Sequence, residues 1–193
     1  GYSRKGDCPS CGASHYISQT RYLGTTSIDW KGKSPAEPFE TLAWHDHEFG
    51  SQTLGKGQTG WDWFGIQFKT QDELMLFRVR HEEPSESYLA GTWIDPTGKT
   101  TSLSREDIEL EPLRSIRGHD GVGYPVEWKI RIKKPQTVFF SLKADMDQQI
   151  NNNNLPGFPN YWEGASSVFI DQEKVGDAYL ELTGYDQTKK PRF

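Results

Sequence analysis

The chain has 193 residues, 34% of them hydrophobic, and a formal net charge of −5, a length that suits one domain with a sizeable core and is short for two. Its acidic and basic residues are interspersed, which argues against nucleic-acid binding. No apolar run reaches the roughly 18 to 20 residues of a membrane-spanning helix, and residues 1–10 carry no signal-peptide pattern. Membrane association would therefore depend on segments outside this sequence.

Cys8 and Cys11 stand in the motif GDCPSCG near the start of the chain. A single C-x-x-C without a second pair is weak evidence for a zinc or redox site. His15 could add a third ligand, but no fourth is visible nearby. The spacing favours a disulfide, or two plain thiols, in a proline-containing loop, and metal binding is the less favoured alternative.

Short runs of alternating polarity, separated by Gly, Pro, Asn and Asp, indicate antiparallel β structure. We expect strands at residues 14–22, 60–69, 73–81, 88–95, 124–132, 137–144, 162–170 and 178–185. Residues 104–115 could form either a short helix or an edge strand. The pattern of residues 151–160 predicts an exposed loop. This many short strands in one domain favours a closed barrel or a sandwich.

The stretch TLAWHDHEFG concentrates histidines, carboxylates and a tryptophan. In an extended strand Trp44, Asp46 and Glu48 share one side, whereas His45 and His47 share the other. Two histidines at this spacing can bind a metal, a carboxylate pair can transfer protons, and the same groups can simply link neighbouring strands. We favour the interpretation that these groups link neighbouring strands. We predict no metal site at the two histidines because no third inward ligand can be assigned.

The run GWDWFGIQF places Asp62 on one face with Phe64 and Ile66, and places Trp61 and Trp63 on the other face. A carboxylate on the more apolar face must be paired, hydrogen-bonded or held protonated. The two arginines of LFRVRH point to one face of the following strand. They could neutralise an inward carboxylate through bidentate contacts.

Two later runs also mix polar and aromatic side chains. YWEGA puts Tyr161 and Glu163 on one face, and LELTGY groups Glu181 with Thr183 and Tyr185. Taken singly, each is more often a satisfied core group than a catalyst. Several such clusters in one chain favour a shared polar lumen.

Eight of these motifs stand in the order expected of a known family. The runs GYSRKG, ASHYISQTR, WHDHEFG, GWDWFGIQ, ELMLFRVR, YPVEW, YWEGA and YLELTGYD together resemble the family that unites carotenoid 1,2-hydratase with the AttH-like proteins, often called predicted secreted hydrolases. The resemblance implies an all-β, antiparallel lipocalin-like barrel and a protein of two such domains. Residues 1–193 would then be the C-terminal domain, and residues 1–35 the segment arriving from a missing N-terminal domain.

The resemblance also implies a function. A lipophilic ligand, isoprenoid or lipid-like, would lie in the barrel lumen, and the reaction would be a cofactor-independent hydration of an isolated alkene. The alternative is a non-catalytic ligand-binding or transport-associated module. A periplasmic or secreted location follows from the same resemblance, and the lack of a G-x-S-x-G motif argues against a hydrolase triad.

Hydration sets requirements that can be matched to residues. A neutral carboxylic acid in an apolar pocket must protonate carbon, aromatic faces must lie beside the carbocation, and a polar group must position the water. Asp62 suits the acid, and Asp46 or His47 suits water activation. The expected ligand-binding residues are Trp44, Glu48, Trp61, Trp63, Tyr161 and Glu163.

Overall fold

The computed structural model of the chain describes residues 2–6, 11–26, 39–50, 54–151 and 160–186. All strand pairs within these ranges are antiparallel. The helical pieces among these residues are two short 3-10 turns, η1 (Pro84–Glu86) and η2 (Arg105–Asp107). No helix in the described part of the chain is long and apolar enough to span a membrane.

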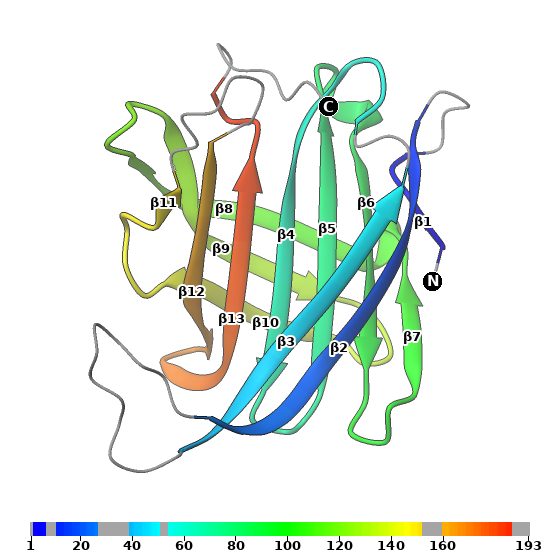
Figure 1. Cartoon of the computed structure of the whole chain (residues 1–193), viewed down its shortest axis with the longest axis vertical. Coiled ribbons are helices and arrows are strands. Elements are labelled where there is room, and N and C mark those ends of the chain that lie inside the picture. Colours follow the sequence, from blue (N-terminus) through cyan, green and yellow to red (C-terminus); the bar gives the residue numbers. More distant parts are fainter. Residues whose placement is uncertain (1, 7–10, 27–38, 51–53, 152–159, 187–193) are drawn as a thin grey trace.

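Ten strands form one large sheet, in the order β7-β6-β5-β4-β13-β12-β10-β9-β8 with β11 paired to β12. Their bounds are β4 (Gln58–Phe68), β5 (Glu73–His81), β6 (Tyr88–Ile94), β7 (Thr100–Leu103), β8 (Ile108–Arg117), β9 (Gly123–Ile132), β10 (Val138–Ala144), β11 (Ile150–Asn151), β12 (Tyr161–Ile170) and β13 (Glu173–Thr183). The sheet curls so that β8, β9 and β10 cross behind β4 to β6 (Figure 1). This curled half-barrel confirms the lipocalin-like all-β fold.

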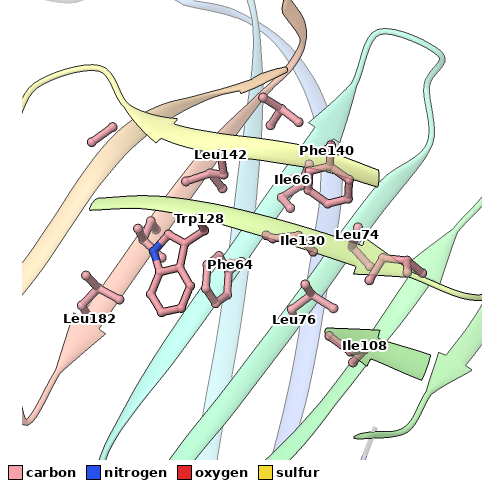
Figure 2. Packing of buried hydrophobic residues seen from close by; sticks show 14 of the residues in the cluster. Phe64, Ile66, Leu74, Leu76, Ile108, Trp128, Ile130, Phe140, Leu142 and Leu182 are labelled. Carbon is pink, nitrogen blue, oxygen red and sulfur yellow. The ribbon is translucent and has the colours of Figure 1, made fainter. Parts of the chain in front are cut away.

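The hydrophobic core fills the inside of the curl (Figure 2). Phe64 and Trp128 pack edge to face with ring centroids 5.3 Å apart, and Phe68 meets Phe140 in the same manner at 5.4 Å. Both pairs join the front strands of the sheet to the strands that cross behind them. Aromatic pairs of this geometry add about 0.5–1.5 kcal/mol to the effect of burial, so they hold the curl closed.

A second sheet lies across the face of the large sheet that is turned away from the core. It has three strands in the order β1-β2-β3, with bounds β1 (Tyr2–Arg4), β2 (Ala13–Thr26) and β3 (Phe39–Gly50). Strands β2 and β3 run diagonally over β4, β5 and β6 (Figure 1). Side chains join the two sheets: Gln67 Nε2 donates to the carbonyl of Thr20 at 2.6 Å, and Arg21 pairs with Glu73.

Each of the eight strands expected from the sequence occurs in the large or the small sheet. Residues 73–81 match β5 at both ends, whereas each of the other seven differs at one end or both. Residues 104–115 contain both alternatives, because Ser104 and Asp107 form a capping box around η2 and the chain then continues as edge strand β8. Within the segment expected to arrive from another domain, the structure describes β1 and β2; that role stays a prediction. Of the expected loop at 151–160, residues 152–159 lie outside the described residues.

Cys11 is disulfide-bonded. The sequence holds one other cysteine, Cys8, which lies outside the described residues. The disulfide is therefore the correct alternative for Cys11. Its neighbour Gln58 donates to the carbonyl of Lys5, so strand β4 also contacts the chain directly after β1.

Candidate functional site

A cavity of about 470 Å³ lies between the three-stranded sheet and the large sheet. Its aromatic lining consists of Tyr16, Phe49, Trp61, Trp63 and Phe77, and its polar lining of Ser3, Lys5, Ser14, Asp46, Glu48 and Glu181. An adjoining cavity of about 440 Å³ shares Asp46, Trp63 and Glu181 with it and adds Trp44. We call the two together the intersheet trough.

Strand β4 separates the trough from the core. Asp62 and Phe64 are fully buried on the core face, whereas Trp61 and Trp63 line the trough, as the alternation predicts. A Cβ atom at Gly65 would collide with the indole ring of Trp63, so the glycine lets that ring lie along the sheet. The ring of Trp44 meets Trp63 edge on, 5.5 Å between centroids, from the opposite wall.

Glu181 is a carboxylate set among these aromatic rings. It lies on β13 directly opposite Trp63 of β4 on one side and Glu163 of β12 on the other, and it accepts a hydrogen bond from Trp61 Nε1. Burial raises the pKa of Glu181 to about 7, the Trp61 hydrogen bond opposes this shift, and nearby carboxylates such as Glu163 and Asp46 add to it. A carboxyl with this pKa is present in both protonation states near neutral pH, which suits a general acid.

Asp46 projects into the trough from β3. Its Oδ1 accepts hydrogen bonds from the Tyr16 hydroxyl at 2.6 Å and from Trp44 Nε1 at 2.7 Å. Burial raises the pKa of Asp46 although the two hydrogen bonds lower it. The carboxylate is thus held in a fixed orientation by two donors on its own sheet.

The far end of the first cavity is polar. Lys5 Nζ pairs with Glu48, and the Ser14 hydroxyl donates to the same carboxylate oxygen. Lys5 Nζ also lies 5.9 Å from the centroid of the Phe77 ring. Among the described residues that line the trough, Lys5 is the only cationic side chain, and Glu48 matches its charge.

Tyr161 and Glu163 border the trough without lining either cavity. The Tyr161 ring meets Trp61 edge on at 6.2 Å, and burial raises the pKa of Glu163. They extend the polar and aromatic surface beyond Glu181, along β12. The structure therefore gathers these two residues near the other expected ligand-binding residues.

The structure separates His45 and His47 from the trough. Both histidines are exposed and neither lines either cavity; the His47 ring lies beside that of Phe49, with ring centroids 5.2 Å apart. A role for His47 in water activation stays a prediction that this placement does not favour. Within the ranges that the structure describes, no group of three or more His, Cys, Asp or Glu side chains could hold a metal ion.

Asp62 lies on the core side of β4, away from the trough. Its Oδ2 accepts a hydrogen bond from Arg78 Nε at 2.7 Å, and its Oδ1 pairs with Arg80 and accepts the Tyr185 hydroxyl at 2.8 Å. The arginine pairing expected from the sequence is confirmed. The carboxylate is thereby occupied on both oxygens, whereas the proposed acid role requires a free proton donor.

The comparisons with known proteins agree with this fold. A family model described as AttH-like matches residues 1–185, and no curated protein matches the chain. This chain is similar to the crystal structure of an AttH candidate from Nitrosomonas europaea, with a TM-score of 0.83 and 28% sequence identity. It is also similar to the crystal structure of kievitone hydratase from Nectria haematococca, with a TM-score of 0.71 and 19% sequence identity. Each match covers 96% of this chain and 56% of the other, so the chain spans just over half the length of these relatives.

Proposed function

The chain belongs to the AttH-like family, and from that premise we propose that its intersheet trough binds an apolar, isoprenoid or lipid-like ligand and hydrates an isolated alkene in it by acid catalysis. The observation that carries the proposal is the Glu181 carboxyl, which lies among tryptophan rings with its pKa raised to about 7. The name of the kievitone hydratase, which shares the fold, supports the reaction class.

Acid-catalysed hydration proceeds in two steps that the trough can serve. The Glu181 carboxyl transfers its proton to one alkene carbon, which forms a C–H bond and leaves a carbocation on the other carbon and a carboxylate on the enzyme. Water then attacks the cation and loses a proton, for which Asp46 is the acceptor. Transfer of a proton from Asp46 back to Glu181 through solvent water restores both carboxyl groups. The sum is then the addition of one H and one OH across the double bond, which requires no cofactor.

Asp62 is the competing candidate for the proton donor. The sequence suggested it because an unpaired carboxyl on an apolar face would be held protonated. Its pairing with Arg78 and Arg80 favours a structural role instead. Glu181, which has no ion pair among the described side chains and lines both cavities, suits the donor better.

The test is turnover of acyclic polyenes and terpenoids in D2O, with mass spectrometry detecting deuterium on carbon. We expect Glu181→Gln to lower turnover by about 10²–10⁴-fold with ligand affinity within a few-fold of wild type. Asp62→Asn and the exposed control Glu109→Gln should retain turnover in the folded fraction. Loss of turnover in Asp62→Asn alone would identify Asp62 as the proton donor. Tight ligand binding without any turnover would show that the protein binds ligands and does not hydrate them.

A further inference from the structure

The charges and rings of the intersheet trough point to a particular class of ligand. We propose that the trough selects ligands whose apolar body carries an organic cation, a tertiary or quaternary ammonium, over neutral and anionic ligands of the same size. The inference takes the trough as the ligand site of the proposed function. It does not depend on the hydration step.

The first argument is charge complementarity. Lys5 is already matched by Glu48, and in the described part of the chain no ion pair joins Asp46 or Glu181 to a cationic side chain. Carboxylates that lose water without gaining a cation raise the free energy of the folded protein. A cationic ligand would compensate them, whereas an anionic ligand would add a further unmatched charge.

The second argument is the chemistry of the walls. Trp61, Trp63 and Trp44 place indole rings around the two unmatched carboxylates. An ammonium within about 6 Å of a ring centroid is attracted by the negative face of the ring. Rings and carboxylates around one apolar space are the combination that organic cations require, because the rings replace water around the alkyl groups and the carboxylates supply the counter-charge.

The protein's own ammonium group shows this combination in the same cavity. Lys5 Nζ lies 5.9 Å from the Phe77 ring centroid and pairs with the Glu48 carboxylate. Around Asp46 and Glu181 the same two elements recur, rings and carboxylates. Among the described residues no ion pair joins either carboxylate to a Lys, Arg or His side chain, and the exposed His45 acts on Asp46 only as a nearby charge. That part of the trough is therefore arranged for a cation that comes from a ligand.

The proposed hydration would place its carbocation beside the same rings and carboxylates. An ammonium ligand would then resemble the reaction intermediate in charge and shape. It should compete with an alkene substrate for the trough and remain chemically unchanged.

The inference is tested by titrating the chain with decyltrimethylammonium, decanol and decanoate, each below its micelle-forming concentration. Calorimetry gives the affinities at about pH 8, where Glu181, with its pKa of about 7, is mostly ionised. We expect the ammonium to bind about tenfold or more tightly than decanol, a difference of about 1.4 kcal/mol, and decanoate to bind most weakly.

The double variant Glu181→Gln with Asp46→Asn should bring the ammonium and decanol affinities together without weakening decanol binding. Glu109→Gln, an exposed change on β8, should leave the preference intact, and near-UV circular dichroism shows whether each variant is folded. Equal binding of the three probes, or an ammonium preference that survives the double variant, overturns the inference.

The outcomes separate this inference from the proposed function. Turnover that depends on Glu181 without any ammonium preference would overturn the inference and leave hydration in place. An ammonium preference that depends on the two carboxylates, without turnover of any alkene, would establish the binding site and remove hydration.

Discussion

Replacing Glu181 by Gln should change how the stability of the fold depends on pH. Burial raises the pKa of Glu181 from its ordinary 4.5 to about 7 in the folded protein. Between these pH values the folded chain binds a proton that the unfolded chain has released. The stability contributed by the neutral carboxyl is therefore fully present below about pH 4.5 and is lost as the pH rises through 7.

The magnitude follows from the same two values. One pKa unit corresponds to about 1.4 kcal/mol, so the full effect of moving from 4.5 to about 7 is at most about 3.5 kcal/mol. The trough opens to solvent, which screens the charge, and we therefore expect about 1–2 kcal/mol. Gln cannot ionise, so the variant should lack this pH-dependent loss.

The assay is urea unfolding of both proteins at several values between pH 5 and pH 8. The difference between wild type and Glu181→Gln isolates the one group, because other titrations are common to both. Glu109→Gln is the matched control: a hydrogen bond from Lys133 lowers the pKa of Glu109, so this group stays ionised over the range and its curve should run parallel to wild type. Parallel curves for Glu181→Gln would refute the reasoning.

Three further outcomes are expected. Asp62→Asn should lower the free energy of unfolding by about 3–5 kcal/mol, because it leaves two partly buried guanidinium groups without their carboxylate; a loss below about 1 kcal/mol in urea unfolding would contradict this. Gly65→Val should displace the Trp63 ring, lower the free energy of unfolding by about 1–3 kcal/mol and weaken the binding of apolar ligands. An unchanged near-UV circular dichroism spectrum would contradict the displacement of the ring. Because Trp61 Nε1 bonds to Glu181, Trp fluorescence should titrate near pH 7 in wild type, and a titration that persists in Glu181→Gln would assign it elsewhere.

Local periodicity accounts for most of the fold that could be predicted. In β4 the alternation correctly put Asp62 on the core face and the two tryptophans on the other, because both faces of this strand are covered. The expected strands did not include β1, β3, β7 and β11, and β8 was one of two alternatives. Of these, β1, β7 and β11 are only 2–4 residues long, and β3 was considered only as a strand that the run WHDHEF could form. The existence of the three short strands depends on partner strands, which a local pattern does not encode.

The sequence also brought out much of the trough, including Trp61, Trp63 and Asp46, but it did not single out Glu181. Glu181 bonds to a tryptophan 120 residues away, and only the pairing of β13 with β4 brings them together. The expected grouping of Glu181 with Tyr185 is wrong, because Gly184 adopts a φ of 72° after the strand ends. Tyr185 consequently turns to the core side, where it donates to Asp62.

The division of β4 between core and trough has a consequence for how the family can diversify. Side chains that pack the barrel and side chains that face the ligand alternate along one strand, so the first set can stay fixed while the second is exchanged. Exchanging one side chain for another on the trough face, unlike adding one at Gly65, alters the chemistry of the site without removing a core contact. Such an arrangement is evolvable: new ligand preferences can arise by single replacements on a scaffold that keeps its stability margin.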